Sequence, residues 1–367
     1  MAYPSRRAFA GALAIGAPAL LLGAHRAMAE NAVVPAADWA RAASPQEGGF
    51  DPAKLEAVEQ TLYPLPTTAL MIVSGGRLVY SYGFIGEASY LASARKSILS
   101  MLYGKYVENG TIDLDKTMGD LGIDEPDGLL PIEKTAKIRD LLIASSGVYH
   151  PAGSPGDDPH KIERGSKKPG TFFHYNNWDF NVLGAIFEKL TGKSVFTALD
   201  EELARPLGFQ DFDIHRQRMM GFQNQSRYLA YHLFLSARDM ARLGLLMARD
   251  GNWNGQQIVP AAWVKESTKE HVPADQVGRG GGLGYAYLWW IPESRTAPQW
   301  KGSFMASGQF GQFVLVLPAI DTVIVHRRAV TDEYAIARNL GKTSFEPTRV
   351  LAPDFLKIAD MIVAAKT

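Results

Sequence analysis

The placement of strand-like segments is the feature that most limits what this chain can fold into. Apolar and β-branched residues that favour strands occur near both ends of the chain, at 69–73, 77–82, 285–291, 312–317 and 322–326. The first two segments are joined through Gly75 and Gly76, which predicts a β-hairpin. Strands from both ends can bury their edges together in one sheet, so the sequence predicts a single antiparallel sheet built from both chain ends.

The middle of the chain has helical periodicity instead. Apolar residues repeat every three or four positions in three stretches that start near Ile98, Phe180 and Met240 and close at Gly110, Gly192 and Gly251. Further helices are expected at 51–63 and 353–364. The predicted fold class is therefore α+β, with an antiparallel sheet flanked by helices and an inserted, mostly helical lobe.

The N-terminus is predicted to be an export signal. Arg6 and Arg7 precede an apolar run that is short for a membrane-spanning helix, and Ala27-Met28-Ala29 has the small-x-small pattern of a signal-peptidase site. The order Ser-Arg-Arg-x-Phe resembles a twin-arginine signal. We expect residues 1–29 to be removed and the protein to be periplasmic or secreted.

Length and the strand pattern together predict how the chain that remains after cleavage is divided into lobes. About 338 residues remain after cleavage. This length exceeds what a single hydrophobic core usually supports. We expect an α/β lobe with the sheet from residues 30–92 plus 260–367, and a mostly helical lobe from residues 93–259. A cleft between two lobes is the natural place for a site.

Charge and composition exclude several function classes. Cleavage at residue 29 lowers Lys+Arg from 38 to 35 against 38 Asp+Glu, a net charge near −3 that gives no footprint for nucleic acid or an anionic membrane. The chain has no cysteine and its eight histidines lack metal-binding spacing, so no metal and no cofactor are expected. His150, His160 and His174 flank the predicted site, although core or surface positions suit them better. The sequence leaves the oligomeric state open.

A short motif at the start of the helical region carries the first chemical signal. Ser93-Ala94-Arg95-Lys96 is the one Ser-x-x-Lys in the chain, and positions i and i+3 of a helix share a face. A serine hydroxyl needs a nearby base to act as a nucleophile, and a lysine serves when its pKa is lowered. The alternative is an ordinary helix start with Ser93 as its N-cap.

A second motif follows about eighty residues later. Tyr175 and Asn177 form a Tyr-x-Asn just before the expected helix. A tyrosine held near a lysine ammonium can shuttle protons, and Asn177 can fix Lys96 or a substrate carbonyl by hydrogen bonding. The alternatives are a half-buried loop tyrosine and an N-cap asparagine.

The order Ser-x-x-Lys, Tyr-x-Asn and then a Gly-rich strand resembles the serine β-lactamase-related and penicillin-binding family, in its class C form. Segments between these motifs carry the same resemblance, at 110–115, 138–147, 169–171, 205–209, 236–240 and 306–312. It covers roughly residues 69–327. The sequence His174-Tyr175-Asn176-Asn177-Trp178 is similar to that of the esterase and 6-aminohexanoate-oligomer hydrolase branch of the family.

The resemblance implies a mechanism, residue by residue. Ser93 would attack a carbonyl to form an acyl-enzyme, and Lys96 with Tyr175 would share the base role and protonate the leaving group. Asn177 would orient Lys96 or the substrate. The oxyanion would lie between the N–H of Ser93 and a backbone N–H on the third strand, placed at Gln309 next to Gly308.

One departure from the family bears on the substrate. Antibiotic-handling members carry Lys-Thr-Gly or a close relative on the third strand, where it binds a carboxylate, whereas this chain has Gly302-Ser303-Phe304-Met305-Ala306-Ser307-Gly308. The preferred substrate is therefore a small-molecule ester or small amide without a required carboxylate. Arg327 and Arg328 offer charge instead, although surface arginines at a strand end explain them better.

Three functions stay open at this point. The first is an esterase or amidase of the serine hydrolase type. The second is a D-alanyl-D-alanine carboxypeptidase or β-lactamase. The third is an inactive penicillin-binding-like module that binds cell-wall peptide or a protein partner.

Overall fold

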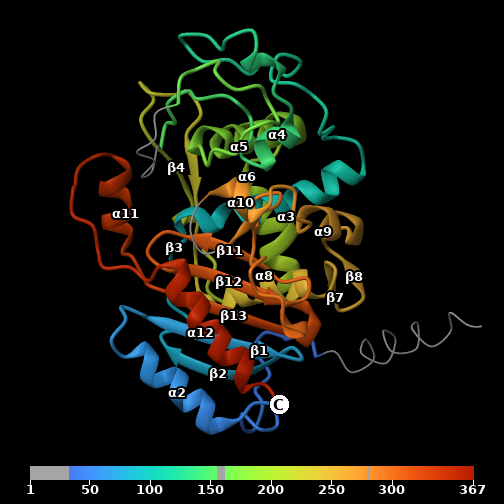
Figure 1. Ribbon diagram of the computed structural model, residues 1–367, viewed down its shortest axis with the longest axis vertical. Helices are drawn as coiled ribbons and strands as arrows, with labels where there is room; N and C mark the ends of the chain where they lie inside the picture. The colour runs from blue at the N-terminus through green and yellow to red at the C-terminus, as the bar shows by residue number, and fades with distance from the viewer. Residues whose placement is uncertain (1–32, 155–161, 279–281) are drawn as a thin grey trace, which may run out of the picture. The chain divides into compact units, whose positions relative to one another are not determined.

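The computed structural model describes residues 33–154, 162–278 and 282–367 (Figure 1). The predicted export signal and His160 lie outside the described residues. Residues Val34–Thr367 form a single unit, so the predicted division into two lobes stays a prediction.

A seven-stranded antiparallel sheet forms the centre of this unit. Its strands, in spatial order, are β2 (Arg77–Gly83), β1 (Ala69–Ser74), β13 (Thr322–Arg327), β12 (Gln312–Leu317), β11 (Phe304–Gly308), β10 (Trp290–Ile291) and β9 (Gly284–Tyr285). The N-terminal strand β1 pairs with the C-terminal strand β13, in a register from Ala69 opposite Arg327 to Ser74 opposite Thr322. The predicted sheet from both chain ends is confirmed.

The hairpin between β1 and β2 turns where the two glycines predict it. Gly75 and Gly76 have φ of 58° and 77°, the left-handed values that a two-residue hairpin turn requires. A register shift between Ile72 and Val73 adds a local bulge to the pairing.

The prediction of a single strand at 285–291 is wrong. The chain reverses there, so that β9 and β10 pair with each other, Trp290 opposite Tyr285. Leu288 lies at φ 65°, and its backbone N–H and C=O bond to Leu142 O (3.1 Å) and Ser97 Oγ (2.7 Å). Tertiary contacts with the helices thus fix a tight turn inside a segment whose residues favour extended structure.

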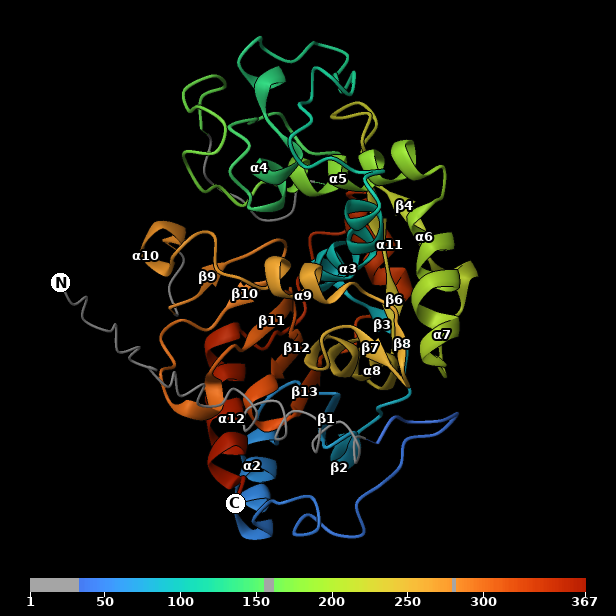
Figure 2. The same cartoon turned by 90° about the vertical axis from the view of Figure 1, so that its right-hand side faces the viewer.

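Helices cover both faces of the sheet, which explains why its central strands are buried throughout. Helices α2 (Pro52–Leu62) and α12 (Ala352–Ala365) lie on one face and α8 (Ala237–Ala248) on the other (Figures 1 and 2). Phe355 of α12 stacks on Phe313 of β12, with ring centroids 4.6 Å apart. On the opposite face, a Cβ at Gly244 of α8 would lie 2.5 Å from Val323, so the glycine allows close helix–sheet packing.

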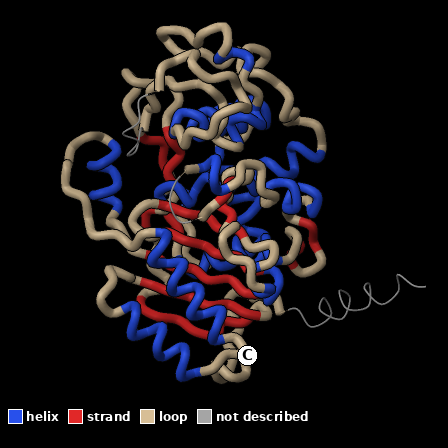
Figure 3. Tube along the Cα trace, in the orientation of Figure 1, coloured by secondary structure: helices blue, strands red, loops and turns tan. Residues whose placement is uncertain are grey.

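The remaining elements are mostly helices and short two-stranded pairs (Figure 3). The helices are α3 (Arg95–Glu108), α4 (Ile138–Leu142), α5 (Asn177–Thr191), α6 (Val195–Ala198), α7 (Arg205–Leu207), α9 (Ala261–Ser267), α10 (Ala274–Val277) and α11 (Asp332–Asn339). The pairs are β3 (Ser89–Tyr90) with β6 (Phe234–Leu235), β4 (Arg218–Met220) with β5 (Ala230–His232), and β7 (Asn252–Trp253) with β8 (Gln256–Gln257). No helix in the described ranges is long and apolar enough to cross a membrane.

The predicted helices are confirmed as α2, α3, α5, α8 and α12, and Gly192 caps α5 with φ 71°. The sequence interpretation did not predict α11, a short helix between β13 and α12. Helix α8 falls in the range expected for the helical lobe, yet it packs directly on β12 and β13. The predicted α+β architecture is therefore present, with a sheet covered on both faces.

Candidate active site

Ser93 lies in a tight turn that leads into α3. The 3₁₀ segment Ala92–Ala94 precedes the helix, and Ser93 in its centre is half-buried. Ala92 has φ 48°, a conformation that costs a non-glycine residue about 1–3 kcal/mol. The Arg95 guanidinium donates to the Ala92 carbonyl (3.3 Å) and to Asn181 Oδ1 (3.3 Å) on α5, which supports this turn.

Lys96 extends from the first turn of α3 and is 1% exposed. Its Nζ donates to Ser93 Oγ at 3.0 Å, to Tyr175 Oη at 2.8 Å and to Asn177 Oδ1 at 2.7 Å. The same Nζ lies 4.1 Å from the centroid of the Phe180 ring. The structure therefore brings together the two halves of the sequence motif, separated by about eighty residues in the chain.

The loop before α5 positions Tyr175 and Asn177. Asn176, not Asn177, caps the helix, because its Oδ1 accepts from Trp178 N at 3.1 Å. Asn177 is the first helical residue, and its side chain points to Lys96 instead of serving as a cap. The Tyr175 ring packs between Phe180 (4.7 Å between centroids) and Trp290 (5.4 Å).

Strand β11 closes the site on its other side. A Cβ at Gly308 would lie 2.3 Å from the Leu91 carbonyl oxygen and 2.9 Å from Ala94 N. The strand can approach the turn that holds Ser93 because position 308 has no side chain. Gln309 follows directly and lines the same cavity as Ser93, and its predicted part in holding an oxyanion stays a prediction.

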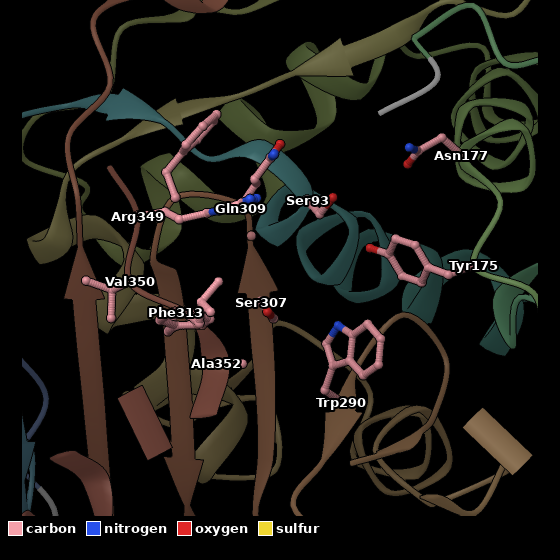
Figure 4. Close-up of a pocket in the computed structure, with 13 residues that line it drawn as sticks. Ser93, Tyr175, Asn177, Trp290, Ser307, Gln309, Phe313, Arg349, Val350 and Ala352 are labelled. Carbon is pink, nitrogen blue, oxygen red and sulfur yellow. The ribbon is translucent and has the colours of Figure 1, made fainter. Parts of the chain in front are cut away.

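These residues line one cavity of about 250 Å³ (Figure 4). Its lining consists of Ser93, Tyr175, Asn177, Trp290, Ser307, Gly308, Gln309, Phe310, Phe313, Arg349, Val350, Leu351 and Ala352. In Figure 4, Tyr175 and Asn177 lie on one side of Ser93, and Gln309 and Arg349 lie on the other. Five of the six predicted site residues line the cavity, and the sixth, Lys96, lies behind Ser93.

Part of the lining was missed by sequence reasoning. Residues 349–352 precede and begin α12 and form one wall, although no motif or periodicity in the sequence marks them. Trp290, which follows the reversal between β9 and β10, also lines the cavity. Trp289 and Trp300 are buried elsewhere, with Trp289 packed on Phe304 at 5.1 Å between centroids.

Arg327 and Arg328, which were expected at the surface, are held by hydrogen bonds within the protein. Arg327 is 2% exposed, which corrects the interpretation of a surface residue. Its guanidinium donates to Gln312 Oε1 (2.6 Å) and to Ser89 Oγ (2.5 Å), and burial lowers its pKa to about 9. Arg328 donates to Thr348 O at 2.9 Å. Neither side chain lines the cavity.

Buried titratable groups surround the site without lining it. Burial raises the pKa of Asp179 on α5 well above its usual value, while the Ser146 hydroxyl, which donates to it at 2.6 Å, and the charge of Lys96 act in the opposite direction. Burial lowers the pKa of His232 well below its usual value. His150 bonds to Asp127 (2.8 Å), and His174 packs on Tyr149 (5.3 Å between centroids).

Comparisons with known proteins agree with this architecture. Residues 55–327 match the family described as Beta-lactamase. A solved structure of a candidate 6-aminohexanoate-dimer hydrolase from Bacillus anthracis is similar, with 22% identity, a TM-score of 0.60, and coverage of 83% of this chain and 80% of that chain.

Two further solved structures are similar. A penicillin-binding protein from Bacillus halodurans has 14% identity and a TM-score of 0.55, and the match covers 77% of this chain and 99% of that chain. EstCE1, a hydrolase with promiscuous acyltransferase activity, has 17% identity and a TM-score of 0.55, and the match covers 79% of this chain and 98% of that chain. At these identities the likeness shows the shared fold.

Proposed function

The chain belongs to the beta-lactamase family of hydrolases, and from that premise we propose that it is a serine hydrolase that cleaves an ester or small amide through an acyl-enzyme at Ser93. The observation that carries the proposal is the Lys96 amine, which lies within 3.0 Å of both Ser93 Oγ and Tyr175 Oη at the edge of an open cavity. A nucleophile, a base and a group that orients the base are the elements that such catalysis needs.

In the proposed first step, Ser93 Oγ attacks the substrate carbonyl carbon and its proton passes to the Lys96–Tyr175 pair. The new Oγ–C bond forms as the bond to the leaving alcohol or amine breaks, and the pair returns the proton to that leaving group. In the second step the same pair takes a proton from water, whose oxygen attacks the acyl carbon. The Oγ–C bond then breaks, the pair returns the proton to Ser93 Oγ, and the acid product leaves. General acid–base catalysis of this kind contributes about 10²–10⁴-fold to a rate.

Two further groups have proposed supporting roles. Asn177 Oδ1, which accepts from Lys96 Nζ at 2.7 Å, would hold the amine in line with Ser93. The negative charge on the carbonyl oxygen would be stabilised by the backbone N–H groups of Ser93 and Gln309, and the fact that both residues line one cavity supports this role.

The test is intact-mass analysis of the protein after exposure to a fluorophosphonate and, separately, to a penicillin. The expected result is one fluorophosphonate adduct on wild type and none on Ser93→Ala. Ser307→Ala is the matched control, because Ser307 lines the same cavity, and it should keep the adduct.

The outcomes separate the three open functions. A penicillin adduct, or loss of penicillin from solution, would favour the carboxypeptidase or β-lactamase function over the esterase. A wild-type protein that neither reagent labels, with penicillin persisting, would contradict the hydrolase proposal and favour a binding module.

A further inference from the structure

The proposed reaction needs the Lys96 amine in its neutral form, because only a neutral amine has a lone pair that can take the Ser93 proton. Burial favours that form, and Lys96 is 1% exposed. A second cation close by favours it further, since two like charges in a site with little water repel each other. The residue directly before Lys96 in the chain, Arg95, is such a cation.

Arg95 is buried without an acidic partner in the described part of the chain. Its side chain is 4% exposed, and its guanidinium donates to the Ala92 carbonyl and to Asn181 Oδ1, both at 3.3 Å. The guanidinium carbon lies 4.8 Å from the centroid of the Tyr231 ring, and Nε has no hydrogen-bond partner among the described residues. These contacts are with neutral groups, so they hold the guanidinium in place and leave its charge uncompensated.

One face of α5 holds the two cations side by side. Lys96 Nζ donates to Asn177 Oδ1 at 2.7 Å, and Arg95 Nη2 donates to Asn181 Oδ1 at 3.3 Å. Asn177 and Asn181 are four residues apart in the helix, so their Cβ atoms lie about 5–6 Å apart on the same face. The charge of Arg95 therefore acts on the Lys96 amine over a short distance through the protein interior.

The other titratable groups near Lys96 supply no compensating negative charge. Burial raises the pKa of Asp179 on α5 well above its usual value, which favours the neutral carboxyl. Burial, and then the charge of Arg95, lower the pKa of His232 on β5 well below its usual value, which favours the neutral ring. Tyr175 belongs to the proposed proton-transfer pair, and β10 and β11 carry no charged side chain.

Charged residues of the other segments packed on α3 have partners away from Lys96 or are exposed. They are Glu188, Lys189, Asp200, Glu201, Glu202, Lys265 and Glu266. Arg95 is thus the charged group that the described chain places beside the amine.

From these observations we propose that Arg95 is a positioning residue, whose uncompensated charge keeps the Lys96 amine neutral and ready to take the Ser93 proton. The inference rests on the proposed function, because it names the group that prepares the base of that reaction. A guanidinium suits this role, since it does not lose its own proton in proteins and the repulsion is relieved at the amine instead. In the neutral form the Ser93 hydroxyl rotates to donate its hydrogen to Nζ.

The test follows the rate of Ser93 labelling by an uncharged fluorophosphonate between about pH 5 and pH 10. Labelling should rise with pH as the base loses its proton, so the midpoint of the rise reports the pKa of the base in the free enzyme. In Arg95→Gln the midpoint should move up by about 1–2 pH units, as expected for two unit charges roughly 6–8 Å apart at an effective dielectric constant near 20. The plateau rate at high pH should change less, because the amine is neutral there in both proteins.

Two variants separate the charge of Arg95 from its packing. Arg95→Lys keeps a positive charge and should bring the midpoint back toward the wild-type value. Arg242→Gln is the matched control, because Arg242 is also buried and donates to a backbone carbonyl, that of Leu207 at 2.6 Å, but lies on α8 beside Asp239. It should lose stability and leave the midpoint unchanged.

The inference is overturned if Arg95→Gln leaves the midpoint within about 0.3 pH units of wild type, a change well below that expected for the two charges. It is also overturned if Arg242→Gln moves the midpoint as far, or if the wild-type midpoint is not below about 10.4, the ordinary value for lysine.

Thermal unfolding of each variant shows whether it is folded. If Arg95→Gln does not fold, Asn181→Asp decides, because it pairs the guanidinium with a carboxylate and should raise the midpoint; an unmoved midpoint overturns the inference. Absence of labelling in wild type at every pH would contradict the proposed function, whereas labelling with an unmoved midpoint contradicts the role of Arg95 alone.

Discussion

The Lys96 side-chain nitrogen is held in a nearly closed site of oxygen atoms and aromatic rings. Burial of a polar amine costs free energy, which hydrogen bonds must offset. Ser93, Tyr175 and Asn177 supply the oxygens, and Phe180 and Tyr175 present ring faces within 4.2 Å of Nζ. The residues proposed for catalysis are therefore also the ones that make the buried amine tolerable.

Removal of the Tyr175 hydroxyl should separate catalysis from packing. We expect Tyr175→Phe to slow both fluorophosphonate labelling and ester hydrolysis by about 10²–10⁴-fold, because the proton-transfer route is lost. The ring contacts with Phe180 and Trp290 remain, so the variant should stay folded and its loss of stability should be limited to the hydrogen bond from Lys96. The measurement is the labelling rate followed by mass spectrometry.

Tyr149→Phe is the matched control for this variant. The Tyr149 hydroxyl is buried and has no hydrogen-bond partner in the described chain, so its removal should leave the labelling rate unchanged. A Tyr175→Phe protein that labels as fast as wild type would remove Tyr175 from the mechanism.

At the scale of elements, the contact between β11 and the turn before α3 decides whether the site forms. Gly308 lies against Leu91 and Ala94, and the β11–β12 hairpin turns at Phe310 (φ 72°) and Gly311 (φ 116°). The hairpin is also bonded to the segment that carries Arg349. A change at position 308 therefore affects the nucleophile, the predicted oxyanion group and the arginine together.

Gly308→Ala should disrupt this contact. A Cβ at 2.3 Å from a backbone oxygen cannot be accommodated unless β11 moves, so we expect the free energy of unfolding to fall by about 1–3 kcal/mol. Labelling of Ser93 should fall with it, because the strand is displaced from the turn. Urea unfolding and the labelling rate measure the two effects.

Gly119→Ala serves as the comparison, since the nearest atom to a Cβ there is the Lys134 oxygen at 3.3 Å. It should lose less stability and keep full labelling. Equal behaviour of the two variants would show that the approach of β11 to the turn is not critical.

At the scale of the whole molecule, His326 links the sheet to the site and makes stability depend on pH. Its Nδ1 lies 2.8 Å from the Gly311 carbonyl and must donate to it, so the neutral ring accepts from Thr67 Oγ1 (2.9 Å) at Nε2. Burial lowers the pKa of His326 from 6.5 to about 4. Between these two values the unfolded chain binds a proton at this position and the folded chain does not.

The contribution of His326 to stability is therefore complete above pH 6.5 and is lost as the pH falls to about 4. The loss should reach roughly 3 kcal/mol, and His326→Gln should remove it, so that the unfolding free energy falls less steeply between pH 6.5 and 4. Burial also raises the pKa of Asp239 to about 6, which has the opposite sign, and the difference between wild type and variant isolates the histidine.

Urea unfolding at a series of pH values measures this difference. The exposed His215 offers the control, and His215→Gln should follow the wild-type profile. Parallel profiles for wild type and His326→Gln would contradict the proposed origin of the acid sensitivity.

The sequence by itself determined the helices and turns that depend on residues close together in the chain. Apolar periodicity, the paired glycines of the first hairpin and the Gly192 cap are set by neighbours a few residues apart, and α2, α3, α5, α8 and α12 follow from them. The motif residues Ser93, Lys96, Tyr175 and Asn177 were also readable, because their types and order are distinctive. They meet in the structure within hydrogen-bond distance.

Tertiary structure alone decided what depends on contacts between distant segments. The reversal at Leu288 comes from bonds to α3 and to the end of α4, and Arg327 is buried because partners from β3, β6 and β12 surround it. The wall at 349–352 belongs to the site because Val350 bonds to Phe310, about forty residues earlier in the chain. Such contacts leave no periodic or compositional trace, since each depends on where the completed sheet brings two segments together.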